Sequence, residues 1–253
     1  MAQTSGIEWT ETTWNPVTGC DRVSPGCDNC YALTMARRLK AAGSARYQVD
    51  GDPRTSGPGF GLTIHPDLVN LPRRWVKPRT VFVNSMSDLF HAKVPAGFIA
   101  DVFATMAATP QHTYQVLTKR PLRAARLADS LTWPANVWLG VSVESPDQVN
   151  RLDLLRRTPA AVKFISAEPL LAALPDLDLK EIDWLIVGGE SGPRHRPIQA
   201  DWVRDLRDQS LAAGVRFFFK QWGGARPKSN GRELDGRVWD EMPPLAAEIL
   251  STG

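Results

Sequence analysis

Short apolar runs alternate with amphipathic segments along this chain, and that alternation restricts the folds it can adopt. Six runs of Val, Ile, Leu and aromatic residues are each five to eight residues long. They occupy residues 80–84, 113–118, 136–143, 162–167, 183–189 and 215–220, and a shorter strand is expected near 8–15. Nearly continuous apolar runs of this length are typical of parallel strands covered on both faces.

Helical patterns fall between these runs. They are expected at residues 29–42, 96–108, 122–131, 146–157 and 201–213. Strands that alternate with helices predict an α/β protein with a parallel sheet. Six or seven such units favour a partial or nearly closed parallel (β/α) barrel, in which ligands bind at the carboxyl ends of the strands.

One barrel domain is expected over residues 1–222, because no linker divides the chain. An irregular insertion rich in Gly and Pro interrupts it at residues 44–78, where it is expected to fold over a site or to form a long surface loop. Residues 223–253 carry Asn-Gly and Asp-Gly dipeptides, which predict a C-terminal hairpin and tail packed on the barrel.

Composition and charge bear on location and partners. No apolar run approaches the ~20 residues that a membrane helix needs, and the N-terminal residues lack the basic and apolar segments of a signal peptide. The chain is therefore expected in the cytoplasm, where thiols stay reduced. Its net charge of +3 is compatible with a polyanionic partner and does not require one.

All three cysteines lie in one stretch, TGCDRVSPGCDNCYA, at residues 18–32. Cys20, Cys27 and Cys30 follow the spacing C-x6-C-x2-C. An odd number of thiols in a reducing compartment disfavours disulfides. Glycine and proline inside the stretch let the loop wrap closely around a compact cofactor.

Two kinds of metal site are compatible with three thiols. A structural zinc ion needs four nitrogen or sulfur ligands, so it would require His65 or a carboxylate as the fourth. Iron–sulfur clusters held by four cysteines are typical of electron transfer, whereas three cysteines leave one iron open to chelate a small molecule. We therefore expect Cys20, Cys27 and Cys30 to hold a [4Fe–4S] cluster.

The cysteine stretch resembles that of radical S-adenosylmethionine enzymes, whose commonest spacing is C-x3-C-x2-C, and its CxxCY ending resembles their spore photoproduct lyase branch. Further stretches, in order from Trp9 to Trp222, resemble a phage-associated three-cysteine-motif family: TTWNPVTGC, SPGCDNCYA, VFVNSMSDLF, EPLL, GGESGP and FFKQWG. The resemblance implies a barrel of the radical S-adenosylmethionine type, with S-adenosylmethionine bound at the open iron.

Polar residues follow most of the expected strands. In the lyase branch a strand-two serine, a strand-three lysine and a strand-four serine hold S-adenosylmethionine, and the resemblance carries these roles to Ser85, Lys119 and Ser142. A cation such as Lys119 would pair with the carboxylate of S-adenosylmethionine, and serine hydroxyls would orient the cofactor by hydrogen bonds. Glu190 is a further candidate for cofactor binding and Glu168 for the catalytic site. Instead of binding a cofactor, some of the polar residues at strand ends could cap helices, and Lys119 could be a solvated lysine at a helix start.

The first hypothesis is an enzyme. Reductive cleavage of S-adenosylmethionine would give methionine and a deoxyadenosyl radical, which abstracts hydrogen from a substrate in the barrel mouth. Tyr31, directly after the last cysteine, is a candidate redox relay or a packing residue. Val83 stands where the lyase branch carries a cysteine hydrogen donor, which argues against photoproduct repair. The resemblance also implies an electron donor such as flavodoxin or ferredoxin.

No motif identifies the substrate. The phage-like family and the modest positive charge favour nucleic acid or a nucleotide, as in DNA repair or modification. Trp75, Trp138 and Trp222 are candidates to stack on bases or to pack in the core. The rival hypothesis is a non-catalytic nucleic-acid-binding protein, in which the cysteine loop holds zinc or an electron-transfer cluster.

Overall fold

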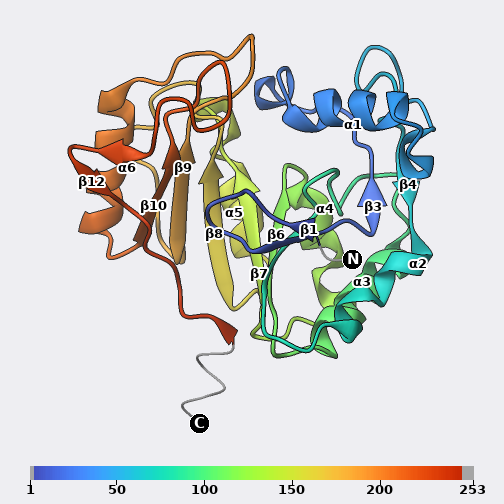
Figure 1. The fold of residues 1–253 in the computed structure, drawn as a ribbon. Helices are drawn as coiled ribbons and strands as arrows, with labels where there is room; N and C mark the ends of the chain where they lie inside the picture. The colour runs from blue at the N-terminus through green and yellow to red at the C-terminus, as the bar shows by residue number, and fades with distance from the viewer. Residues whose placement is uncertain (1–2, 247–253) are drawn as a thin grey trace.

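The computed structural model describes residues 3–246. The last seven residues of the expected C-terminal tail, 247–253, lie outside the described residues, as do residues 1–2. Eight strands form one curled sheet in the order β1-β2-β5-β6-β7-β8-β9-β10 (Figure 1). Strand β1 (Gln3–Thr4) pairs antiparallel with β2 at one edge.

The remaining seven strands of this sheet run parallel to one another. They are β2 (Thr12–Trp14), β5 (Thr80–Val83), β6 (Thr113–Thr118), β7 (Val137–Ser142), β8 (Val162–Ala167), β9 (Trp184–Gly188) and β10 (Arg216–Gln221). The sheet confirms the predicted α/β fold with a partial parallel barrel, and two of the expected strands, β6 and β8, have the predicted bounds.

Helices connect most of the parallel strands. They are α1 (Tyr31–Ala41), α2 (Pro66–Val69), α3 (Ala96–Ala107), α4 (Pro121–Leu127), α5 (Arg151–Arg156) and α6 (Ala200–Ala212). The helix expected at 122–131 ends at Leu127 and continues as a 3-10 turn over 128–130, where the Ser130 hydroxyl donates to the Leu127 carbonyl at 2.7 Å. A side chain that binds the backbone in this way competes with the helical hydrogen bonds.

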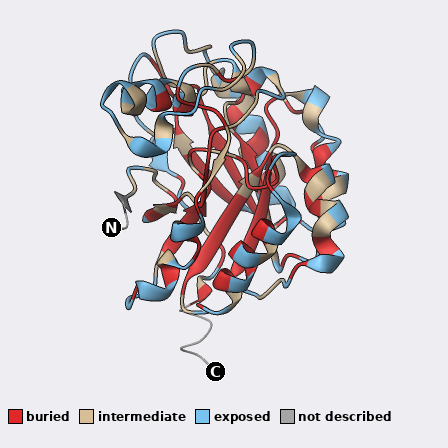
Figure 2. Cartoon of the chain, turned by 90° about the vertical axis from the view of Figure 1, so that its right-hand side faces the viewer, coloured by how far each residue is buried: buried red, intermediate tan, exposed pale blue. Residues whose placement is uncertain are grey.

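Apolar cores lie on both faces of the sheet, and the strands are buried between more exposed helices and loops (Figure 2). The larger core packs the sheet against α3, α5 and α6. The smaller core covers the other, inner face with aromatic side chains, among them Trp9, Phe82, Trp138, Phe164 and Trp184. Burial on both faces explains why the strands are apolar at nearly every position.

The insertion at 44–78 packs against the cysteine loop. Its strand β4 (Thr63–Ile64) pairs with β3 (Val17–Thr18), which lies directly before that loop. Gly19 has a φ of 83°, and a Cβ there would lie 2.2 Å from the Gly61 carbonyl oxygen. The close approach of these two segments therefore requires glycine.

A short hairpin follows β10. Strands β11 (Glu233–Leu234) and β12 (Arg237–Val238) pair antiparallel across Asp235 and Gly236, whose φ angles are 54° and 74°. Two central residues with positive φ are typical of the hairpin turn that Asp-Gly predicts. The expected division of the chain at residue 222 stays a prediction. Within residues 3–246, no helix combines the length and the apolar character needed to cross a bilayer.

Candidate functional site

The cysteine loop lies over the carboxyl ends of the parallel strands, with α1 beyond those ends at the top of Figure 1. Its Ser24 hydroxyl donates to Glu144, which follows β7, at 2.7 Å. Its Asn29 amide donates to Glu190, which follows β9, at 2.9 Å. Its Asp21 carbonyl accepts from Arg120, which follows β6, at 2.7 Å. Residues that end three strands thus hold one loop.

The three thiols lie close together at this edge. Cys20 and Cys30 pack against one small apolar cluster that includes Phe60 of the insertion, and Cys27 is near enough to both for its charge to raise their pKa values. Burial is the main cause that raises the pKa of Cys20 to about 12 and that raises the pKa of Cys30. Without a metal these two thiols are protonated at neutral pH, so metal binding would release protons.

Within residues 3–246, no group of three or more His, Cys, Asp or Glu is arranged to hold a metal ion. His65, the candidate fourth ligand of a zinc site, is buried with its Nε2 2.9 Å from the Thr18 hydroxyl. A zinc site with His65 as its fourth ligand would therefore require both a rearranged loop and release of His65 from this contact, whereas one with a carboxylate would require only the rearranged loop.

Glu144 is the buried centre of an ion-pair network. The residue is 0% exposed, and its Oε1 accepts hydrogen bonds from Lys119 Nζ and from the Ser24 hydroxyl. Its Oε2 accepts from Arg151 Nη1 at 2.9 Å. Burial by itself would raise the pKa of Glu144, but the charges of Lys119 and Arg151 outweigh it and hold that pKa below its usual value. Lys119 is therefore an ion-paired residue of the site and not a solvated one.

The glycine before Cys27 is explained by the same network. A Cβ at Gly26 would lie 2.5 Å from the Glu144 carboxylate, so only glycine lets the loop settle on this buried group. Glu144 was recognisable in the sequence only as one of several polar residues that follow a strand. Nothing in local periodicity indicates that it binds Lys119, Arg151 and the cysteine loop together.

A second buried carboxylate, Asp88, organises the ends of β5 and β6. Asp88 is 5% exposed and accepts from the Thr118 hydroxyl at 2.8 Å and from the Lys119 amide at 3.0 Å. It also accepts from Arg120 Nη1 at 3.1 Å, and the same Nη1 lies 3.3 Å from Cys20 Sγ. Asp88 and Arg120 thereby connect the sheet to the first cysteine, a link that the sequence does not reveal.

Ser85 and Tyr31 are in contact. The Tyr31 hydroxyl donates to the Ser85 carbonyl, and the Ser85 hydroxyl lies 3.2 Å from Asn15 Oδ1 at the end of β2. The neighbouring Asn84 is 3% exposed, and its two side-chain polar atoms have no hydrogen-bond partner among the described residues. Burial of its hydroxyl raises the pKa of Tyr31, and the charges of Cys30 and Glu168 raise it further, although the residue is 52% exposed overall.

Glu168 and Ser142 occupy the ends of β8 and β7. The Glu168 carboxylate pairs with Lys220 at the end of β10, and both side chains are mostly buried. The charge of Glu168 raises the pKa of Tyr31, so these two residues expected in the catalytic site are near enough to interact electrostatically. Ser142 is 2% exposed and lies opposite Ser166 in the sheet, while its carbonyl accepts from Arg151 at 2.7 Å.

Glu190 fastens the loop after β9 to the cysteine loop. The residue is 6% exposed and its carboxylate accepts from Asn29 Nδ2 and from the backbone and guanidinium of Arg196. Arg196 Nη2 in turn donates to the Pro25 carbonyl at 2.9 Å. Burial would raise the pKa of Glu190, but these hydrogen bonds lower it overall. This carboxylate therefore supports the cysteine loop, and its expected role in cofactor binding stays a prediction.

Two of the three tryptophans considered for base stacking are buried in the core. Trp75 is 7% exposed and Trp138 is 1% exposed. The prediction that they stack on bases is therefore wrong for both, and their alternative role, packing in the core, is confirmed. Trp222 is partly buried against Phe219, with ring centroids 4.7 Å apart, and its Nε1 donates to the Glu233 carbonyl at 2.8 Å.

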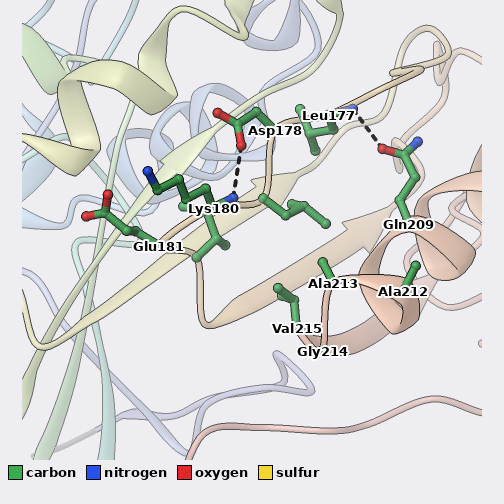
Figure 3. Close-up of a pocket in the computed structure, with 11 residues that line it drawn as sticks. Leu177, Asp178, Lys180, Glu181, Gln209, Ala212, Ala213, Gly214 and Val215 are labelled. Carbon is green, nitrogen blue, oxygen red and sulfur yellow. Dashed lines mark hydrogen bonds between the residues drawn. The ribbon is translucent and has the colours of Figure 1, made fainter.

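A separate surface depression lies at the opposite, amino end of β9 and β10 (Figure 3). It is formed by residues 177–182, before β9, and by the end of α6 with residues 213–215, before β10. Hydrogen bonds from the Leu177 amide to Gln209 and from the Lys180 amide to Asp178 stabilise its walls. Ligands of parallel α/β sheets bind at the other end of the strands, so this depression is not part of the candidate site.

Comparisons with known proteins give a family and a set of structural neighbours. A profile of the family described as "Protein of unknown function (DUF5131)" matches residues 4–243. A spore photoproduct lyase mutant with dinucleoside spore photoproduct is similar at 13% identity and a TM-score of 0.49, over 83% of this chain and 63% of that one. Another mutant of that enzyme, with bound AdoMet and dinucleoside spore photoproduct, has 12% identity and a TM-score of 0.48, over 83% and 64%. No curated protein sequence matches the chain.

Proposed function

We propose that this chain, which belongs to the DUF5131 family of proteins of unknown function, is a radical S-adenosylmethionine enzyme with a [4Fe–4S] cluster on Cys20, Cys27 and Cys30. One observation carries the proposal. A loop with all three thiols of the protein is fastened over the carboxyl ends of seven parallel strands, where Lys119 also lies. The phage association of the motifs stays a prediction.

The donor set fits such a cluster. Thiolate sulfur is the ligand that iron–sulfur clusters use in proteins. Because the irons of a cluster occupy separate corners, its three thiolates need not converge on one ion. Hydrogen bonds made by Arg120, Asn29 and Ser24 hold the loop to the sheet, and such preorganisation lowers the conformational cost of binding.

The strand ends supply groups suited to the amino acid part of S-adenosylmethionine. Lys119, Arg151 and Glu144 carry two positive charges and one negative charge, so the network keeps a net charge of +1 beside the cysteine loop. That excess attracts the carboxylate of the cofactor. Ser85 and Ser142 end the strands on either side of β6 and would offer hydroxyls for its orientation.

When bound and reduced, the cluster would supply the electron that cleaves S-adenosylmethionine into methionine and a deoxyadenosyl radical. The residues of the chain would position the substrate and exclude water. Tyr31, whose hydroxyl donates to the Ser85 carbonyl and whose pKa the charge of Glu168 helps to raise, would contact a substrate above the sheet, and Glu168 itself pairs with Lys220. The radical's substrate, a nucleic acid or nucleotide in our hypothesis, stays a prediction, as does an electron donor such as flavodoxin or ferredoxin.

Anaerobic reconstitution tests the proposal. The wild-type protein is expected to take up iron and sulfide, to bind S-adenosylmethionine, and to release deoxyadenosine and methionine slowly after reduction with dithionite. Cys20→Ala, Cys27→Ala and Cys30→Ala should each lose the cluster, since each iron would lose its protein ligand. Val23→Ala, an exposed site in the same loop, should retain it.

Three outcomes would contradict the proposal. Full iron and sulfide content in the three cysteine variants would remove these residues as ligands. A colourless protein with stoichiometric zinc would favour the metal-stabilised binding protein instead. A loaded, reduced protein that binds S-adenosylmethionine and yields no deoxyadenosine, with or without nucleotide substrates, would refute radical chemistry.

A further inference from the structure

The guanidinium of Arg120 makes the one charged contact to a cysteine sulfur among the described hydrogen bonds. Its Nη1 lies 3.3 Å from Cys20 Sγ, and its Nη2 donates to the Asp21 carbonyl at 2.7 Å. The Arg120 side chain is 15% exposed. The only side-chain contact described for Cys27 Sγ is the neutral hydroxyl of Ser24, at 3.9 Å. Cys20 is therefore chemically distinct from the other two thiols.

The position of Arg120 is fixed from the sheet side. Its Nη1 also pairs with Asp88 at 3.1 Å, and its amide donates to the Thr118 hydroxyl at 2.9 Å. Asp88 is itself held by Thr118 and by the Phe90 amide, at 2.8 and 3.0 Å. The guanidinium is thus oriented by buried groups at the ends of β5 and β6 in addition to its contacts with the cysteine loop.

We propose that Arg120 is a positioning residue that orients Cys20 and sets the reduction potential of the cluster. This inference rests on the proposed function. Reduction adds negative charge to a cluster and its thiolates, and a cation that donates to one of those sulfurs stabilises the reduced state more than the oxidised state. Arg120 therefore makes the cluster easier to reduce, while its bond to the Asp21 carbonyl keeps the first thiol directed toward the metal.

Three variants separate the effect of the Arg120 charge from that of its hydrogen-bonding geometry and from a change of net charge elsewhere in the protein. Arg120→Gln removes the cation, and Arg120→Lys keeps the charge but cannot reach the sulfur and the Asp21 carbonyl with one planar group. Arg126→Gln makes the same charge change at an exposed position of α4. Midpoint potentials come from redox titrations followed by electron paramagnetic resonance, and the rate of iron loss to a chelator gives a second readout.

We expect the potential to become more negative in Arg120→Gln, to fall between that value and wild type in Arg120→Lys, and to stay unchanged in Arg126→Gln. Iron loss should be faster in both Arg120 variants, because Cys20 is held less firmly. Wild-type potentials in both loaded variants would overturn the inference. If Arg120→Gln fails to fold, the potential of Arg120→Lys decides in the same way. A wild-type protein that takes up no cluster would instead refute the proposed function.

Discussion

Neutralising Glu144 should destabilise the protein more than any exposed charge change. Glu144→Gln keeps the shape of the side chain but removes the negative charge that faces Lys119 and Arg151. Glu144 is 0% exposed, and the two cations are 20% and 10% exposed, so water replaces little of the lost interaction. Removing one partner of a buried ion pair costs about 3–5 kcal/mol. We expect the free energy of unfolding to fall by that amount at pH 7.

The loss should depend on pH with a definite sign. Burial raises the pKa of Glu144, but the charges of Lys119 and Arg151 lower it by more than burial raises it. The pKa in the folded protein therefore lies below that in the unfolded chain. Its contribution to stability is then fully present above the ordinary carboxyl pKa of about 4.3 and disappears as pH falls through the lower folded value. The wild type and Glu144→Gln should therefore differ at pH 7 and converge in acid.

Urea-induced unfolding of the metal-free protein, followed by circular dichroism at several pH values, measures this difference. Asp153→Asn is the matched control, because that carboxylate is 79% exposed and pairs with Arg156 on the surface. Exposed pairs of this kind contribute about 0–1 kcal/mol. The reasoning would be refuted if the Glu144 and Asp153 variants were equally stable at pH 7, or if the Glu144 deficit persisted undiminished in acid.

Two further substitutions test the site. Lys119→Ala should weaken S-adenosylmethionine binding to the cluster-loaded protein about ten- to a hundredfold in calorimetry, because one charge-assisted contact is lost. The control Lys93→Ala, whose side chain is 69% exposed, should leave the affinity unchanged. Unchanged affinity in Lys119→Ala would remove Lys119 from the cofactor site. Glu190→Gln should speed hydrogen exchange in the cysteine loop, since Asn29 and Arg196 lose their charged partner. Equal exchange rates would contradict the role of Glu190 in holding that loop.

The strands were predictable because burial on both faces imposes a local rule. Residues 113–118 and 162–167 are apolar at most positions, and both became strands with those bounds. Helix bounds were less predictable. The segment 146–157 divides into a 3-10 turn at 146–148 and α5, because short-range hydrogen bonds at a helix start outweigh a periodic pattern of this length.

The sequence also determined which chemistry the site can offer. Three thiols within eleven positions stay together in any fold, because the chain between them is short. Parallel strands bring their carboxyl ends to one edge, so the serines and lysine that follow them had to gather there. The identity and number of the candidate ligands therefore needed no tertiary information.

Only the tertiary structure decided how these groups are paired. Ser24 and Glu144 are 120 residues apart in sequence and 2.7 Å apart in space. Arg120 reaches Cys20 across 100 residues. Such contacts depend on strand order and on where loops pack, and local periodicity contains neither. A charged residue at the end of a strand is thus visible in the sequence, but its partner, and with it the pKa and the role of the group, is fixed only when distant segments fold against each other.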